Sequence, residues 1–96
     1  MIEVRQTETF SKWLAKLRDI RARARILARI DRLELGNPGV VRPVGSGVSE
    51  MKIDYGPGYR VYFIKKGSEL IVLLAGGNKS SQSRDIQIAI GLANEL

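Results

Sequence analysis

The sequence predicts an α+β fold for one domain spanning residues 1–96, with elements in the order β-α-α-β-β-β-α. Three observations predict this fold. A length of 96 residues suits a single small domain. Apolar residues recur at helical spacing in the first third of the chain, whereas they alternate or run together in its middle. Short glycine-containing turns separate the middle segments, so we expect a mostly antiparallel sheet with a helical hairpin packed on it.

The first third of the chain predicts one strand and two helices. A short strand is expected over Ile2–Thr7, where apolar and charged residues alternate. The Thr7 hydroxyl is suited to cap a helix over Thr9–Leu17. A second helix is expected from Asp19 to Leu35, where the run Gly-Asn-Pro-Gly ends it. Its apolar stripe, at 3,4 spacing, consists of Ile26, Ile30 and Leu33.

The rest of the chain predicts three strands and a last helix. Polar and apolar residues alternate over Ser49–Tyr55, and aromatic and β-branched residues fill Tyr59–Lys65. The uninterrupted apolar run Leu70–Ala75 is typical of a central strand that is covered on both faces. A final helix is expected from about Ser81, because apolar residues return to helical spacing there.

The composition excludes several classes of chemistry. The chain has no cysteine and no histidine, which excludes disulfides, thiol nucleophiles, Ser-His-Asp triads and imidazole metal ligands. We therefore expect no metal and no cofactor, and any catalysis must use Lys, Arg, Tyr, Asp or Glu. Sixteen basic residues against ten acidic ones give a net charge of +6, which favours a polyanionic partner.

The distribution of apolar residues favours a cytoplasmic protein without a membrane partner. The longest apolar run, Leu70–Ala75, is far shorter than the roughly 20 residues of a membrane-spanning helix. The first residues lack the basic and apolar regions of a signal peptide.

Part of the positive charge forms a stripe on the second helix. Arginines recur there at the 3,4 spacing of one helix face, namely Arg18, Arg21, Arg25, Arg29 and Arg32. The stripe is interpreted either as a solvated helix face or as a surface for RNA or an acidic protein segment.

A second basic cluster is expected on the strands. Lys52 and Arg60 lie close to the Gly-Pro-Gly turn, so they are expected to face each other across the strand pair. Arg42 precedes this pair, whereas Lys79 and Arg84 follow the third strand. Arg60 either pairs with Asp54 or Glu50 across the strands, or it belongs to a basic groove that holds a phosphodiester.

Tyrosines cluster around the same turn, at positions 55, 59 and 62. They are interpreted either as residues that fill a half-buried sheet or as rings that stack on exposed bases. Asp85, with the nearby Ser80 and Ser81, is expected to serve the start of the last helix.

Several short motifs, spread over nearly the whole chain, occur in an order that is typical of one family. They are Phe10-x-x-Trp13-Leu14, Ala28-Arg29-Ile30-x-Arg32-Leu33, Gly36-Asn37, Gly47-Val48-x-Glu50, Gly56-Pro57-Gly58-Tyr59-Arg60-Val61-Tyr62, and Gly76-Gly77-Asn78-Lys79-Ser80-Ser81-Gln82 with Asp85-Ile86. Through them the chain resembles the RelE/ParE superfamily of type II toxin–antitoxin toxins, specifically its HigB-like branch of addiction-module killer proteins. The family fold is similar to the element order predicted above.

The resemblance implies a bacterial growth inhibitor that is held inactive by an antitoxin. The antitoxin is expected to be of the helix-turn-helix type, and operator DNA is expected to be contacted only through the toxin–antitoxin complex. RelE-like members enter the ribosomal A site and cleave mRNA there. The resemblance therefore implies a metal-independent, ribosome-dependent endoribonuclease whose partners are the ribosome and mRNA.

The resemblance also implies roles for individual residues. Arg60, in the Gly-Tyr-Arg motif, is expected to stabilise charge on the phosphate. Lys79 matches the basic residue after the third strand, and Lys52 lies near the position of a catalytic lysine in some members. Further residues expected to contact RNA are Arg42, Tyr59, Arg84, Arg25, Arg29 and Arg32.

The chain departs from the family at the expected catalytic positions. Asp85 replaces a tyrosine that many RelE-like nucleases carry, and the histidines of some HigB proteins are absent. The remaining candidates for the general base are Lys52, Glu50 and Asp85. Two alternatives to a nuclease stay open: a ParE-like inhibitor of DNA gyrase, which needs no base, and a basic adaptor that only binds RNA.

Overall fold

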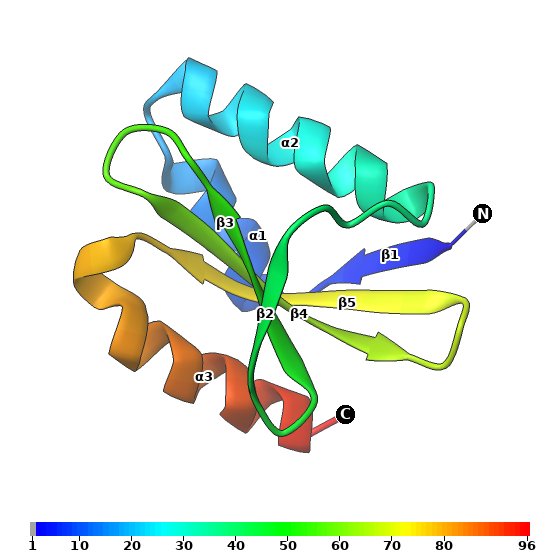
Figure 1. The fold of residues 1–96 in the computed structure, drawn as a ribbon. Helices are drawn as coiled ribbons and strands as arrows, with labels where there is room; N and C mark the ends of the chain where they lie inside the picture. The colour runs from blue at the N-terminus through cyan, green and yellow to red at the C-terminus, as the bar shows by residue number, and fades with distance from the viewer. Residues whose placement is uncertain (1) are drawn as a thin grey trace.

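A computed structural model of the chain describes residues 2–96, in which five strands form one mixed sheet between helices (Figure 1). The elements are β1 (Glu3–Gln6), α1 (Glu8–Lys16), α2 (Ile20–Glu34), β2 (Val41–Gly45), β3 (Val48–Ile53), β4 (Tyr59–Lys66), β5 (Leu70–Gly77), the short 3₁₀ helix η1 (Lys79–Ser81) and α3 (Gln82–Asn94). Helices α1 and α2 cover one face of the sheet and α3 covers the other (Figure 1). The predicted α+β class is confirmed.

The sheet has the strand order β1-β5-β4-β3-β2. Only β1 runs parallel to its neighbour β5, and the three other pairs are antiparallel. A mostly antiparallel sheet is therefore confirmed.

Strand β2 was not expected from the sequence. Pro43 lies within it, and proline lacks the N–H group that a central strand needs for its hydrogen bonds. β2 tolerates Pro43 because it pairs only with β3 and forms the edge of the sheet. The sheet therefore has one strand more than the predicted order.

Side-chain caps determine where α1 and α2 begin. The Thr7 hydroxyl accepts a hydrogen bond from the Phe10 N–H at 3.1 Å and donates one to the Leu74 carbonyl at 2.7 Å, which joins the start of α1 to β5. The Asp19 carboxylate accepts from the N–H groups of Arg21 and Ala22. The expected cap at Thr7 is confirmed, whereas Arg18 precedes the Asp19 cap and lies outside α2.

The core has two parts, one on each face of the sheet. Phe10 and the predicted stripe of α2 (Ile26, Ile30 and Leu33) are buried between the sheet and the α1–α2 hairpin. A smaller cluster, which includes Tyr62, Leu74 and Ala89, is buried between the sheet and α3. Because both faces are covered, β5 is buried on both sides, as its continuous apolar run predicts. No helix within residues 2–96 has the length and apolar character needed to cross a membrane.

Candidate functional site

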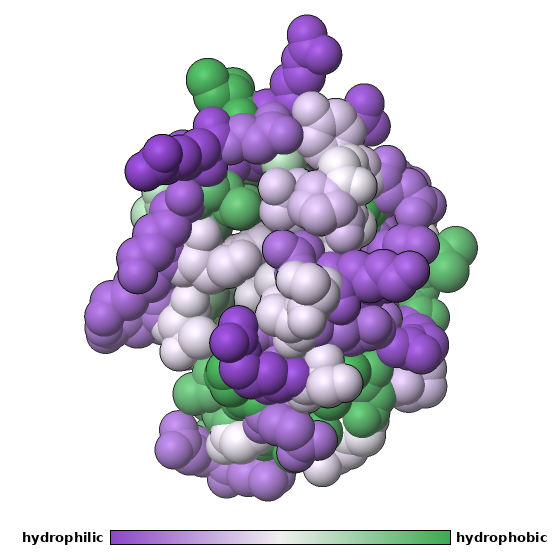
Figure 2. Space-filling model, turned by 90° about the vertical axis from the view of Figure 1, so that its left-hand side faces the viewer, coloured by the Kyte–Doolittle hydropathy of each residue, from purple (hydrophilic) through white to green (hydrophobic). Residues whose placement is uncertain are grey.

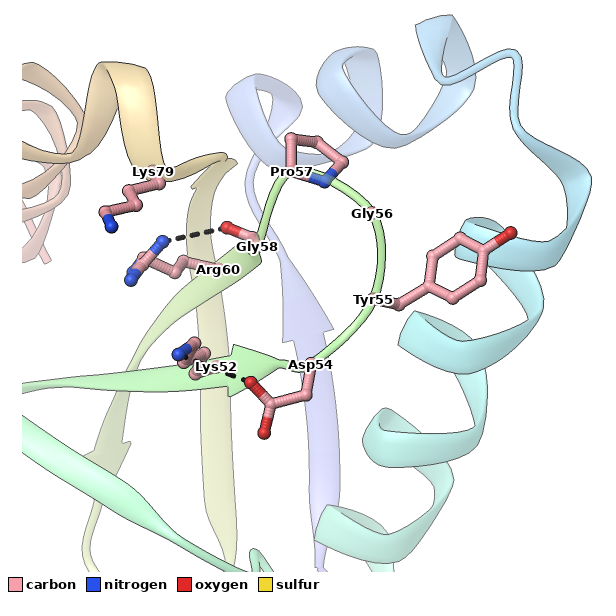
Figure 3. Close-up of a pocket in the computed structure, with 8 residues that line it drawn as sticks. All are labelled: Lys52, Asp54, Tyr55, Gly56, Pro57, Gly58, Arg60 and Lys79. Atoms are coloured by element: carbon pink, nitrogen blue, oxygen red, sulfur yellow. Dashed lines mark hydrogen bonds and ion pairs between the residues drawn. The ribbon is translucent and has the colours of Figure 1, made fainter.

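A pocket of about 390 Å³ lies beside the turn that joins β3 to β4. Gly56 and Gly58 adopt positive φ angles of 58° and 78° in this turn, a conformation that favours glycine. The pocket is lined by Lys52, Asp54, Tyr55, Gly56, Pro57, Gly58, Arg60 and Lys79 (Figure 3). We call it the cation pocket. Figure 2 views the molecule from the side of this turn and of the start of α3, where hydrophilic and weakly polar side chains make up most of the surface.

Three basic side chains meet at the cation pocket, and they come from three different elements. Lys52 of β3 pairs directly with Arg60 of β4 in the antiparallel register, as the sequence predicted. Arg60 also pairs with Gly77 of β5, which brings the following segment and Lys79 to the same place. Figure 3 shows the three side chains on one side of the turn. The structure thus brings together the three residues expected to be catalytic.

Arg60 is the most buried of these cations, and its side chain is held in place. Only 8% of the side chain is exposed, and one terminal nitrogen donates a hydrogen bond to the Gly58 carbonyl at 2.8 Å. Its Nε atom lies 3.6 Å from Glu50 Oε2. Of the two pairings that the sequence left open, Arg60 therefore adopts the one with Glu50. A guanidinium held in this way can offer its remaining N–H groups to an anion at little cost in conformational entropy.

Glu50 is a buried carboxylate at the base of the site, with 5% of its surface exposed. One oxygen lies 3.1 Å from Arg42, and the other accepts a hydrogen bond from the Gln82 side-chain amide at 2.8 Å. Together with the Arg60 contact, three side chains from three elements converge on this one group. Glu50 is therefore satisfied and orients its neighbours, since a buried carboxylate is stable only when it is paired.

Tyr62 lies directly opposite Glu50 in the β3–β4 register and is fully buried. Burial raises the pKa of the Tyr62 hydroxyl, and the negative charge of Glu50 raises it further. Tyr62 is consequently neutral at physiological pH. It fills the α3 side of the sheet, so it cannot stack on an exposed base.

Comparisons with known proteins identify the family of this chain. The family model described as "Phage derived protein Gp49-like (DUF891)" matches residues 12–94. The chain belongs to this family. It is a toxin-like family of the RelE/HigB type. A Haemophilus influenzae protein described as uncharacterized is 48% identical over 95 residues, which cover 99% of this chain and 96% of the relative.

Two adjacent glycines of this Gp49-like chain allow helices to pack closely on both faces of β5. A Cβ atom on Gly76 would lie 2.2 Å from the Trp13 ring of α1. A Cβ atom on Gly77, on the opposite face, would lie 1.7 Å from Asp85 Oδ2 of α3. The Asp85 carboxylate accepts a hydrogen bond from the Ser81 hydroxyl, so Asp85 serves the start of α3, as expected.

Arg42 and Arg84 lie in two further pockets next to the cation pocket of the Gp49-like protein. Arg42 lines a pocket that also contains Lys52 and Arg60. Arg84 lines a third pocket, which also contains Lys79 and lies where η1 passes into α3. Both arginines therefore extend the positively charged surface around the three cations. Among residues 2–96, no three acidic side chains are grouped closely enough to hold a metal ion.

The arginines of α2 do not line the cation pocket, and they differ in their contacts. Arg29 donates to the Lys52 carbonyl at 3.0 Å and to the Pro38 carbonyl at 3.1 Å, so its guanidinium joins α2 to β3 and to the loop before β2. Burial lowers the pKa of Arg29, and repulsion from Arg32 adds to this effect. The Arg25 guanidinium lies 4.8 Å from the centre of the Tyr55 ring. Arg32 is exposed.

Tyr59, expected to contact RNA, is placed in the core instead. It is 9% exposed and packs edge-on against Trp13, with ring centres 6.3 Å apart. The Tyr59 ring is therefore buried, because the start of β4 directs it toward α1. Tyr55 is the tyrosine that lines the cation pocket, and its ring points away from the three cations toward α2 (Figure 3).

Gln82 belongs to the site but was not assigned a role from the sequence. It stands in the motif that begins at Gly76, three positions after Lys79 and in the first turn of α3. This position in the motif was the one feature of the sequence from which a role for Gln82 could have been predicted. Its contact with Glu50 depends on the packing of α3 against β3, which the sequence pattern does not specify.

Proposed function

We propose that this chain is the toxin of a type II toxin–antitoxin system, of the HigB-like kind, and that it inhibits translation by cutting mRNA on the ribosome. The observation that carries the proposal is the convergence of Lys52, Arg60 and Lys79 at one pocket, with Arg60 held by Glu50 and by the Gly58 carbonyl. Three cations around one open pocket suit a phosphodiester of single-stranded RNA. The family supports the toxin assignment.

The reaction proceeds by attack of a 2′-hydroxyl oxygen on the adjacent phosphorus. The bond from phosphorus to the 5′ oxygen breaks, which leaves a 2′,3′-cyclic phosphate and a 5′-hydroxyl. Negative charge grows on the non-bridging oxygens during this step, and Arg60 and Lys79 stabilise it. The attacking hydroxyl loses a proton to a base, and the departing 5′ oxygen takes one up.

Lys52 is the best placed of the three candidates for the base. Its side chain is 54% exposed, whereas those of Glu50 and Asp85 are 6% and 8% exposed. Both carboxylates also hold other side chains inside the protein. Lys52 pairs with Asp54 at 3.3 Å, but this ion pair lies at the exposed surface, where a substrate can displace it more easily. We therefore assign Lys52 as the group that takes the proton.

Primer extension on mRNA translated by purified ribosomes tests this function. The wild-type protein is expected to produce cuts at defined codon positions, and Arg60→Ala is expected to lower their rate by about 10²–10³-fold, because it removes a group that stabilises the transition state. Lys66→Ala is the matched control, since this exposed lysine lies at the opposite end of β4. Equal cleavage by Arg60→Ala and wild type would overturn the catalytic role of the pocket.

The second candidate function is a non-enzymatic inhibitor of DNA gyrase. It is favoured by the absence of histidine and by the burial of both candidate carboxylates, which leave Lys52 as the only exposed candidate base. A supercoiling assay with the same preparations separates the two functions. Loss of gyrase activity without any mRNA cleavage would overturn the nuclease proposal and support inhibition of gyrase. Binding of RNA with neither effect would leave the adaptor function.

The family implies an antitoxin as a partner. We expect an antitoxin of the helix-turn-helix type, and we expect the toxin–antitoxin complex to contact operator DNA through this antitoxin. Expression of the chain alone should arrest growth, and co-expression of such a protein from an adjacent gene should restore it. Arg60→Ala should permit growth without the antitoxin while still binding it, which separates toxicity from complex formation.

A further inference from the structure

A second pocket, of about 380 Å³, adjoins the cation pocket and shares two of its residues. It is lined by Val40, Val41, Arg42, Glu50, Lys52, Arg60 and Gln82. Lys52 and Arg60 line both pockets, so an anion bound between these two side chains has the second pocket directly beside it. In a nucleic acid, the group beside a phosphate is a sugar with its base.

The second pocket combines an apolar wall with a polar edge. Val40 is 88% exposed just before the edge strand β2, and Val41 is half-buried next to it. Arg42 and Gln82 supply the polar groups. A nucleobase needs the same combination, because its flat faces are apolar and its edge carries donors and acceptors. The guanidinium plane of Arg42 is also a surface on which a base can stack.

Glu50 determines how the polar edge is presented. A carboxylate only accepts hydrogen bonds, so the contact at 2.8 Å requires the NH₂ group of Gln82 to face Glu50. The Gln82 carbonyl oxygen is then available as an acceptor, and no group within residues 2–96 donates a hydrogen bond to its side chain. Arg42 uses one terminal nitrogen on Glu50, and its side chain is 62% exposed, which leaves other N–H donors accessible.

We infer that the second pocket is a nucleobase subsite, in which Gln82 and Arg42 read the edge of the base next to the bound phosphate. The inference rests on the proposed phosphate site at Lys52, Arg60 and Lys79. The subsite would make cleavage depend on the base next to the cleaved bond. The Gln82 carbonyl accepts a hydrogen bond from a donor on that base, and Arg42 donates one to a neighbouring acceptor.

Titrations of the ¹⁵N-labelled full chain, followed by NMR, test the subsite without any cleavage step. The probes are inorganic phosphate and the four nucleoside 3′-monophosphates. Phosphate alone should shift the signals of Arg60 and Lys79. At least one nucleotide should bind about fivefold more tightly than phosphate and should also shift the Gln82 side-chain amide and the Val40 signal. The four nucleotides should differ in affinity.

Gln82→Ala should narrow the differences in affinity among the four nucleotides, each affinity being taken relative to that of the same variant for phosphate. The matched control is Gln87→Ala, an exposed glutamine of the same helix that lines neither pocket, and it should leave the differences intact. Equal affinities for all four nucleotides, or no shift at Gln82 and Val40, would overturn the subsite while leaving the phosphate site. No binding of phosphate or nucleotides would overturn both. Base-dependent binding without cleavage on ribosomes would support the subsite and overturn only the nuclease.

Discussion

At the scale of single residues, Gly77 is expected to be one of the positions most sensitive to a small side chain. A methyl group there would overlap Asp85, whose carboxylate is buried and hydrogen-bonded at the start of α3. Gly77→Ala should therefore lower the free energy of unfolding by about 1–3 kcal/mol, the usual cost of overpacking. Urea denaturation measures this change.

Gly91 provides the control for this prediction. It lies inside α3, and a Cβ atom there would meet nothing within 4 Å. Gly91→Ala should raise stability by about 0.5–1 kcal/mol, because alanine loses less backbone entropy in a helix than glycine. If both substitutions had the same effect, steric contact with Asp85 would not explain the glycine at position 77.

The buried hydroxyl of Tyr62 is expected to make the free energy of unfolding depend on pH in the alkaline range. Burial, and then the charge of Glu50, raise the pKa of Tyr62 above its ordinary value of 10.0. The unfolded chain therefore loses this proton at a lower pH than the folded chain. Full stability is present below about pH 10, and it falls as the pH rises above 10, by up to about 1.4 kcal/mol per pH unit. Denaturation at a series of pH values measures the slope.

Tyr62→Phe tests this assignment. It should remove most of the alkaline decrease in stability, and it should change stability near pH 7 by less than about 1 kcal/mol, because the Tyr62 hydroxyl has no hydrogen-bond partner within the described residues 2–96. Tyr55→Phe, at a half-buried ring, serves as the control and should keep the slope. An unchanged slope in Tyr62→Phe would assign the alkaline transition to other groups.

At the scale of elements, Arg29 connects α2 with the strands that build the cation pocket. It donates to two backbone carbonyls, of Lys52 and of Pro38. Lysine lacks the planar fork needed to reach both. Arg29→Lys should therefore lower the free energy of unfolding by about 1–2 kcal/mol in thermal or urea denaturation. Arg32→Lys, at an exposed position of the same helix, should change it little, and an equal loss would contradict the bridging role.

The periodicity of the sequence was sufficient for the elements that bury an apolar face. Ile26, Ile30 and Leu33 mark one side of α2, and the alternation over Ser49–Tyr55 places Lys52 opposite Arg60 once the Gly-Pro-Gly turn defines the register. β2 was not predicted, because it contains Pro43 and proline is compatible with a strand only at the edge of a sheet. Whether a strand lies at the edge depends on how the whole sheet is arranged.

Parts of the site depended on packing between elements and could not be read from spacing. Alternation put Glu50 on the face of β3 opposite Met51, but only the position of α3 shows that this face is buried and that Glu50 binds Gln82. In the same way, the sequence predicted that Tyr59 contacts RNA, whereas the structure packs Trp13 against it. The basic residues that meet at the turn were predictable because one strand register relates them.

At the scale of the whole molecule, the charge of +6 is spread over two regions that the proposed function uses differently. Residues 12–36 contribute +5 from eight basic and three acidic side chains, and residues 37–66 contribute +3 from five and two, whereas residues 1–11 and 67–96 contribute −1 each. The first region includes the arginines of α2, of which Arg29 is engaged with backbone carbonyls and Arg25 with the Tyr55 ring. The second holds Lys52 and Arg60, which meet Lys79 at the cation pocket.

This division predicts how binding of a short single-stranded RNA depends on salt. Three phosphate-facing cations should give a slope of about −2 in a plot of log affinity against log salt concentration, since each contact to single-stranded RNA contributes about −0.7. Lys79→Ala should reduce the magnitude of the slope by about 0.7. Arg32→Ala should leave it unchanged, because Arg32 is not among the residues lining the pockets around the three cations. An equal reduction by both variants, measured by fluorescence anisotropy, would show that α2 contacts RNA, and the binding surface would then extend across both charged regions.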